Sequence, residues 1–259
     1  PSSCRPSPAS RRRSPSAATP RTSPSSRTRL FQGSGAPNRL DESRDAQAFY
    51  SQLILDWRER VTLVAGFRLD ESSTFGTEIN PRVGLSYRLP AIETKLRASY
   101  GTGIKAPSFI ENFGTGSPFV VGNPDLGPER SESWEVGFDQ PLPFDDYPAE
   151  ISATYFSADF DDLIGFVFGS TSSFLNIQRA RSRGVEVALR IVTPIGIGFR
   201  GSYTYLDTEV VDSGDLGGTL FVEGEPLLRR PEHFGAFTVD YTAERWTASF
   251  NLTVKGQTS

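Results

Sequence analysis

The sequence predicts an all-β protein, an antiparallel β-barrel that spans a membrane. Three observations support this prediction: apolar and polar residues alternate along most of the chain from residue 46 onward, the alternating segments are about ten to twelve residues long, and short connectors alternate with long ones. A mean hydropathy of −0.34 and the lack of any run of ~20 apolar residues argue against a bundle of membrane-spanning helices.

The alternation is clearest in the segments 61–70, 79–89 and 246–255. In the first of these, apolar side chains occupy every odd position: Val61, Leu63, Ala65, Phe67 and Leu69. Such a period turns one face of a strand apolar and the other polar. The expected strands span 47–57, 61–70, 79–89, 93–103, 131–140, 149–160, 182–192, 196–208, 233–241 and 245–256.

Strand length and connector order favour a membrane barrel over a soluble β-sandwich. Strands of soluble proteins most often have about 5–6 residues, whereas a tilted membrane strand needs roughly 9–11. Every second connector is longer, which predicts one rim of tight turns and one rim of long loops, as in outer-membrane barrels. Aromatic residues near strand ends, such as Trp57, Tyr100 and Trp246, are typical of membrane-interface girdles. The expected longer connectors are 71–78, 104–130, 161–181 and 209–232.

Residues 1–45 differ from the rest and are predicted to be a disordered tail, so that the barrel portion spans 46–259. Residues 1–40 contain ten Ser, seven Pro and eight Arg but no Asp or Glu, and they show no hydrophobic period. Three interpretations remain open: an Arg-rich arm for nucleic acid or anionic lipid, a tail without a specific role, or an artefact of a shifted reading frame. The chain has 24 Arg and 3 Lys, a bias typical of GC-rich coding, and the acidic remainder gives no support for nucleic-acid binding.

The expected inner face carries charges of both signs. An isolated buried charge is costly, so these residues predict a lumen that holds water or another polar protein surface. A lumen filled by a plug and the open channel of a porin both satisfy this condition. The residues that we expect to face the lumen or a plug are Arg82, Arg97, Glu135, Glu186 and Arg190.

Several segments, taken together and in this order, resemble the C-terminal barrel of TonB-dependent outer-membrane receptors. The most specific are Gly-Asn-Pro-Asp-Leu-Gly-Pro-Glu at 122–129, which continues to Gly137, and the segment 176–187, which contains Arg-Gly-Val-Glu at 183–186. The segments 79–89, 96–108 and 226–233 fit the family as well. The resemblance spans roughly 46–257, and it is most similar to the cobalamin-receptor and siderophore-receptor branches.

This resemblance implies a partial barrel, about ten strands of a 22-stranded one, in the outer membrane of a Gram-negative type of cell. It further implies binding and gated passage of a siderophore, a cobalamin or a similar bulky nutrient, with no cofactor, no resident metal and no enzymatic step. Outer-membrane lipid would surround the barrel, and the TonB complex would act through an N-terminal region that this chain lacks. Because the sequence begins at Pro1 and contains no Met, we expect it to be a piece of a longer protein.

Aromatic residues in the expected long loops are the candidate ligand contacts, since aromatic surfaces with nearby polar groups form ligand sites. The alternative is that they pack the loops onto one another. These residues are Phe109, Phe113, Phe119, Phe166, Phe168 and Phe221.

Other motifs favour structural interpretations. The segment 122–129 has the residues of tight turns, and Glu186 fits either a plug contact or an ion pair within the wall. Asp159, Asp161 and Asp162 match no calcium-loop spacing, and the single histidine, His233, has no accompanying nucleophile motif. A passive porin, and then a soluble β-sandwich that binds a ligand, are the alternative functions.

Overall fold

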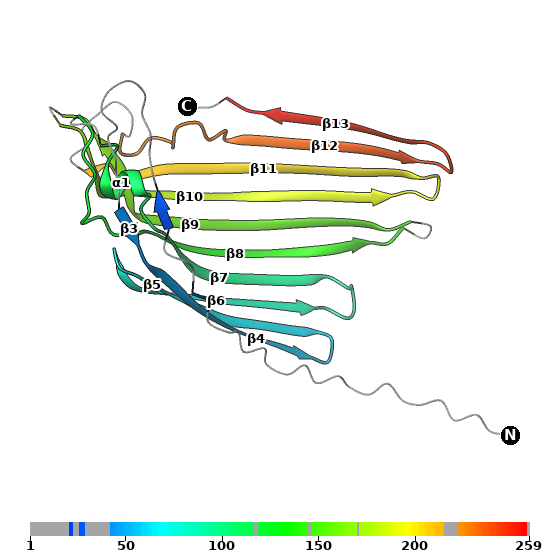
Figure 1. Cartoon of the computed structure of the whole chain (residues 1–259). Coiled ribbons are helices and arrows are strands. Elements are labelled where there is room, and N and C mark those ends of the chain that lie inside the picture. The colour runs from blue at the N-terminus through cyan, green and yellow to red at the C-terminus, as the bar shows by residue number, and fades with distance from the viewer. Residues whose placement is uncertain are drawn as a thin grey trace.

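The computed structural model describes residues 21–22, 26–28, 42–116, 119–144, 147–169, 171–214 and 222–257. Eleven strands form one antiparallel sheet in the order β1-β4-β5-β6-β7-β8-β9-β10-β11-β12-β13, and β2 pairs with β3. Figure 1 shows the large sheet as one curved layer with the helix α1 at one end of the strands. The bounds are β1 Arg21–Thr22, β2 Ser26–Thr28, β3 Glu42–Arg44, β4 Ala46–Trp57, β5 Val61–Ser72, β6 Gly76–Arg88, β7 Lys95–Lys105, α1 Phe109–Phe113, β8 Glu129–Leu142, β9 Ala149–Val167, β10 Ser173–Val192, β11 Ile197–Asp212, β12 His233–Thr242 and β13 Thr247–Lys255.

The order of the strands confirms the all-β antiparallel prediction, because each strand from β4 to β13 pairs with the next one along the chain. Consecutive hairpins place every second connector at the same end of the sheet. The connectors 58–60, 89–94, 143–148, 193–196 and 243–246 therefore share one end, which we call the turn side. The connectors 73–75, 106–128, 168–172 and 213–232 share the opposite end, which we call the loop side.

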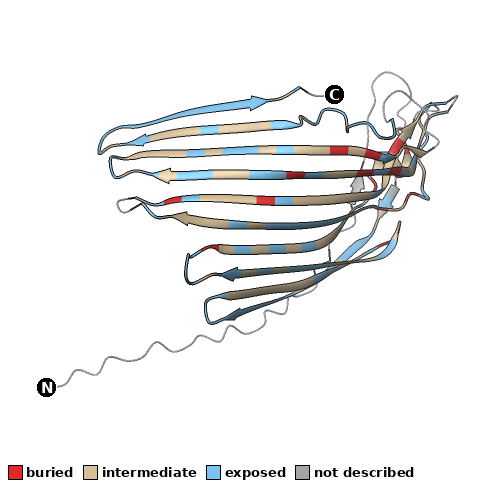
Figure 2. Cartoon of the chain, turned by 180° about the vertical axis from the view of Figure 1, so that it is seen from behind, coloured by how far each residue is buried: buried red, intermediate tan, exposed pale blue. Residues whose placement is uncertain are grey.

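One face of the sheet is apolar across its whole width. Residues that are paired between strands lie on the same face, so the register can be followed from strand to strand. One such row crosses nine strands, and most of its members are apolar or aromatic: Leu55, Leu63, Leu85, Ala98, Val136, Tyr155, Val185, Tyr205 and His233. Leu55, Leu85 and Val136 are nevertheless exposed, and Figure 2 shows exposed stretches along most strands. An exposed apolar face of this extent is suited to hydrocarbon.

The next row, on the opposite face, is mainly polar or small. It runs through Asp56, Thr62, Ser86, Arg97, Gly137, Thr154, Glu186, Thr204 and Phe234. The extensive contacts of β4–β13 within the described residues are with sheet neighbours, and among the described residues of these strands the buried hydrophobic ones are only Ala149, Ala180 and Val210. These contacts exclude the β-sandwich alternative, which needs a second sheet over a dry core.

Strands β9 and β10 are much longer than expected, and this shortens the loop between them from 161–181 to 168–172. At about 3.3 Å per residue, the 20 residues of β10 span roughly 66 Å, well beyond a hydrocarbon core of about 30 Å even when the strand is tilted. The register of β10 with β9 shifts between Asn176 and Gln178 and again between Gln178 and Ala180. Each irregularity changes the phase of the alternation. The apolar–polar period is therefore broken near the loop-side ends of β9 and β10, and the sequence predicts a loop there.

The outer face changes character along the same strands. Val185 is followed toward the loop side by Arg183, and Tyr205 is followed by Asp207, with which Arg183 forms an ion pair at 2.8 Å. Two further ion pairs lie toward the loop side: Arg181–Asp159 at 2.7 Å and Arg179–Asp212 at 3.0 Å. We call the apolar part of the outer face on the turn side of the Arg183–Asp207 pair the lipid band; on β10 it comprises Val185, Val187, Leu189 and Ile191.

The turn side contains one glycine that no other residue can replace without strain. Gly196 has φ +82°, and a Cβ atom there would overlap the carbonyl oxygen of Thr242. The backbone N–H of Thr242 also donates to the carbonyl oxygen of Gly196 at 2.8 Å, so the β10–β11 turn contacts the end of β12.

Strands β1, β2 and β3 lie within the range 1–45 that the sequence predicts to be disordered. Most other residues of that range lie outside the described residues, and for them disorder stays a prediction. Among the described residues, no helix is both long and apolar enough to cross a bilayer.

Candidate functional site

The short helix α1 places two of the candidate aromatic residues on the loop side. Ser108 caps it: its Oγ accepts from the N–H of Glu111 at 3.3 Å, and the Glu111 carboxylate accepts from the N–H of Ser108 at 2.6 Å. The rings of Phe109 and Phe113 lie 5.7 Å apart. Arg44 lies over the Phe109 ring at 5.0 Å, which joins α1 to β3.

The segment 119–128 packs directly on α1. A Cβ atom on Gly122 would overlap the backbone of Phe113, so only glycine allows this approach. The N–H of Asn123 donates to the carbonyl oxygen of Glu111 at 2.8 Å, and its side-chain amide donates to the carbonyl oxygen of Phe174 at 2.9 Å. Leu126 is 2% exposed. The motif at 122–129 therefore joins α1 to the tip of β10.

Asn176 completes this junction from the side of β10. Its Oδ1 accepts from the N–H of Gly127 at 2.8 Å, and its Nδ2 donates to the carbonyl oxygens of Gly127 at 3.0 Å and Asp162 at 2.7 Å. The Glu129 carboxylate accepts a hydrogen bond from the N–H of Ile164 at 3.1 Å and forms an ion pair with Lys105 at 2.9 Å. We call the bonds made by the Asn123 and Asn176 side chains the loop clamp.

The structure brings most of the aromatic candidates to the loop side but does not gather them into one cluster. Phe166 lies near the end of β9 rather than in a loop, and its ring contacts Phe168 at 4.9 Å and Phe174 at 5.0 Å. Phe119 is 72% exposed and Phe168 is 75% exposed. The N–H of Ser172 donates to the carbonyl oxygen of Phe119 at 3.0 Å, so Phe119 lies close to the β9–β10 loop that holds Phe168. Phe221 lies outside the described residues.

Sequence reasoning missed Phe174 and the two clamp asparagines as members of this site. Their signal was present, because Asn123 and Asn176 both lie in segments that resemble the receptor family. Asn112 was missed as well: it is 1% exposed, its Nδ2 donates to the carbonyl oxygen of Asn123 at 3.2 Å, and within the described residues its Oδ1 has no hydrogen-bond partner. A buried unsatisfied oxygen is uncommon in a folded protein.

The five residues expected to face the lumen share the polar face but differ in their partners. Arg97 is paired within the wall: its Nε contacts Asp139 at 3.2 Å, and its Nη2 donates to Thr154 at 2.7 Å. Gly137 lies between Arg97 and Thr154 in the register, and its missing side chain leaves room for this reach. Within the described part of the chain, four of the five have no ion pair or hydrogen bond from their side chains: Arg82, Glu135, Glu186 and Arg190.

Gly184 of the Arg-Gly-Val-Glu motif has a packing role on this face. A Cβ atom there would overlap the carbonyl oxygen of Tyr205 and meet the ring of Phe156, so the glycine accommodates that ring. Glu186 follows two residues later with an exposed side chain. The motif thus combines a close backbone approach with a free carboxylate.

Several charged groups at the loop side form ion pairs with one another. Arg130 lies between the Glu78 and Asp162 carboxylates, with both contacts at 2.5 Å, and these bonds raise its pKa. The pKa of Asp212 is lowered by the backbone N–H of Gly214 and then by Arg179. Within the described residues, no group of three or more His, Cys, Asp or Glu side chains is arranged to hold a metal ion.

Comparisons with known proteins identify one family. The sequence model of the TonB dependent receptor-like β-barrel matches residues 10–259. The chain is 27% identical to the vitamin B12 transporter BtuB of Photobacterium profundum over 83% of this chain and 33% of that protein. It is 29% identical to the iron-regulated outer membrane virulence protein of Vibrio cholerae over 77% of this chain and 32% of that protein.

Solved structures share the fold. The siderophore receptor PirA from Pseudomonas aeruginosa aligns with a TM-score of 0.64 and 21% identity, over 84% of this chain and 38% of that one. The Serratia marcescens hemophore receptor HasR, solved with its hemophore HasA and heme, aligns with a TM-score of 0.62 and 18% identity, over 82% and 44%. The chain spans about a third of the length of the curated relatives that it matches.

Proposed function

Because the chain belongs to the TonB dependent receptor-like β-barrel family, we propose that it forms part of the wall and outer loops of an outer-membrane receptor that takes up a bulky nutrient. The nutrient is of the siderophore or cobalamin class, which is what related proteins of this kind are named for. The receptor binds its ligand at the loop side and passes it inward, without covalent chemistry.

One observation supports this function best: four ionic groups of both signs face inward without partners in the wall. The wall pairs other inward charges, as with Arg97 and Asp139 or Arg200 and Asp240. Unpaired charges of mixed sign fit the surface of a second protein body inside the barrel, since opposite charges there would neutralise them. We propose that Arg82, Glu135, Glu186 and Arg190 contact such a plug, and that Arg97, already paired within the wall, lines the same lumen.

The loop side supplies the ligand surface in this proposal. Exposed aromatic rings that are held by a fixed scaffold lose little freedom on binding. Phe119 and Phe168 fit this description because both are exposed and both sit beside the loop clamp. The partly buried rings next to this surface are those of Phe109, Phe113 and Phe166. Phe221 stays a candidate that rests on the sequence alone.

The test of ligand binding uses the full-length receptor that contains this chain. We expect Phe119→Ala and Phe168→Ala to weaken the binding of a ferric siderophore or of cyanocobalamin about tenfold each, the effect of about 1.4 kcal/mol. Phe250→Ala in the outward face of β13 is the matched control, and it should leave affinity unchanged. Equal affinity in all three variants would remove these rings from the ligand surface.

A passive porin shares the barrel wall, so energy coupling is the discriminating measurement. Uptake should stop when the TonB gene is deleted or the proton gradient of the inner membrane is dissipated, because opening of the plug requires that energy. Uptake that persists under both conditions and does not saturate with ligand would favour the porin.

A further inference from the structure

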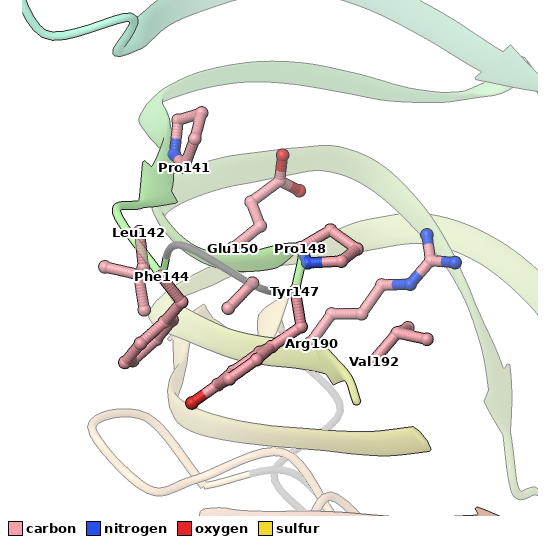
Figure 3. A pocket seen from close by; sticks show the side chains of 9 residues that line it. Pro141, Leu142, Phe144, Tyr147, Pro148, Glu150, Arg190 and Val192 are labelled. Carbon is pink, nitrogen blue, oxygen red and sulfur yellow. The ribbon is translucent and has the colours of Figure 1, made fainter. Parts of the chain in front are cut away.

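The lipid band contains a hollow of about 400 Å³ on the outer face of β10–β13. Its walls and floor come from two neighbouring rows of the register: Val187, Tyr203, Gly235 and Val254 in one, and Leu189, Gly201, Phe237 and Leu252 in the other. Paired residues share a face of the sheet, so the hollow opens toward hydrocarbon. The larger hollow of Figure 3 differs, because it contains the charged side chains of Glu150 and Arg190, which belong to the polar face.

Two glycines form the floor of this outer hollow, and the backbone requires neither of them. Gly201 and Gly235 both lack a positive φ, and a Cβ atom would meet nothing closer than 3.7 Å at Gly201 and 3.9 Å at Gly235. Glycine within a strand weakens that strand, and the other positions of these two rows on β10–β13 carry Val, Leu, Tyr or Phe. We therefore relate the missing side chains to the space that they leave open.

The aromatic ring opposite Gly235 is held away from it. Tyr203 pairs with Gly235 in the register, and an aromatic residue at such a position often covers the glycine. Here the Tyr203 hydroxyl bonds to Nδ1 of His233 at 2.8 Å, two residues nearer the loop side. No atom of Tyr203 lies within 4 Å of the place where a Cβ atom of Gly235 would be. The bond between Tyr203 and His233 thus keeps the hollow open.

The two ends of the hollow differ in polarity. The Tyr203–His233 pair lies at the loop-side end, and the Arg183–Asp207 ion pair lies beyond it on β10 and β11. The next outward row on the turn side is wholly apolar: Ile191, Phe199, Val239 and Phe250. A lipid of the loop-side leaflet has the same order, with its polar end at the membrane surface and its methyl end at the middle of the bilayer. A second copy of the chain fits less well, because Arg183 and Asp207 are already paired and offer no free charge to a polar interface rim.

We propose that the hollow holds one acyl chain of a lipid from the loop-side leaflet, with its polar end beside His233 and its methyl end toward Phe250. An unfilled space loses the dispersion contacts of the atoms around it. A chain that fills the hollow is therefore retained longer than chains that pass over the rest of the lipid band. This inference goes beyond the proposed function, because it concerns the outer face of the wall and holds for any nutrient.

The experiment reconstitutes the full-length receptor in vesicles of phosphatidylethanolamine and phosphatidylglycerol, with a photoactivatable diazirine in one acyl chain of some of the phosphatidylglycerol. One sample has the diazirine near the ester group, and a second has it near the methyl end. Mass spectrometry should find adducts at the hollow about tenfold more often than at Leu85, which is also exposed on the outer face, a ratio that corresponds to about 1.4 kcal/mol. The ester-side probe should label Tyr203 and His233, and the methyl-side probe should label Phe237 and Leu252. Even labelling along the lipid band, or the reverse order of the two probes, would overturn the proposal.

Filling the hollow tests whether its shape is the cause. Gly235→Val should fold like the parent receptor, because the space accepts a Cβ atom and valine favours strands. Adducts at the hollow should fall about tenfold, to the level at Leu85. Ala248→Val enlarges another small outward residue, on β13 outside the hollow, and should leave the adducts unchanged. Undiminished labelling in Gly235→Val, with the receptor folded by its gel mobility, would disprove the site.

Nutrient binding measured on the same proteins separates this inference from the proposed function. We expect Gly235→Val to lose the lipid adducts and to bind its nutrient as the parent does. Protection of the hollow from both lipid probes would show that protein covers it, as a second copy would, and would overturn the lipid site alone. A receptor that is labelled at the hollow but binds no siderophore and no cobalamin would contradict the nutrient class instead.

Discussion

The lipid band and the loop clamp are built from the same strands but depend on different interactions. In the lipid band, each residue position is decided by which side of the sheet faces hydrocarbon, so the pattern repeats every two residues along β10 from Val185 to Ile191. In the loop clamp, each position is decided by a particular backbone atom, as with Asn176 and Gly127. A solvent imposes a period on a sequence, whereas a hydrogen-bonded junction does not.

The largest expected effect tests the lipid band. Leu189→Arg places a charge on the outer face near the middle of the band and should destabilise the folded receptor by about 3 kcal/mol. Ala188→Arg, one residue away on the inner face, should have little effect because it enters a polar lumen. Folding of the full-length protein into lipid vesicles, followed by urea titration, measures both. The reverse order of the two variants would mean that the faces have been assigned the wrong way round.

A smaller and more local effect is expected at the loop clamp. Asn176→Ala removes three hydrogen bonds to backbone groups and should cost about 1–3 kcal/mol locally. Hydrogen exchange of the 119–128 amides should accelerate, while the melting of the barrel stays the same. Asp125→Ala, whose exposed side chain lies in the same segment, serves as the control. A loss of stability across all strands would show that the clamp supports the whole sheet.

The smallest expected effect concerns the end of β11. Because the folded state lowers the pKa of Asp212 from its ordinary 3.8, its bonds are intact above that pH and are lost as the pH falls through the lowered value. The amide resonance of Gly214 should report this titration by NMR. Arg179→Gln should raise the pKa only in part, since the Gly214 N–H is the larger cause. A complete return to 3.8 would assign the shift to Arg179 alone.

This contrast explains what the sequence could predict. The alternation between Val61 and Asp70 predicted the position of β5 within two residues. It did so because every residue of that segment faces either the apolar or the polar side of the sheet. The loop-side ends of β9 and β10 were expected to be loops, because irregularities near Gln178 break the period and Asp161 and Asp162 resemble loop residues. Hydrogen bonding along the backbone continues there regardless of side chains.

In the candidate site, too, the sequence could predict some residues, whereas others are recognised only from the fold. The residue type of Phe119 and Phe168 identified them as candidates. The inward charges were identified by their positions in the alternating pattern, on the polar face of each strand. The sequence provides no means of finding the partners of Asn176, because an asparagine side chain bonds to backbone atoms that only the fold brings near. The paired state of Arg97 likewise depends on Gly137 and Thr154, which lie on other strands.

The reach of Arg97 across Gly137 to Thr154 has a mechanical consequence. One guanidinium links β7, β8 and β9 sideways, in addition to their backbone ladders, and it also holds Asp139. A sideways pull on any one of these strands is therefore shared by the other two. This stretch of wall is therefore stiffened against forces that act across the strands.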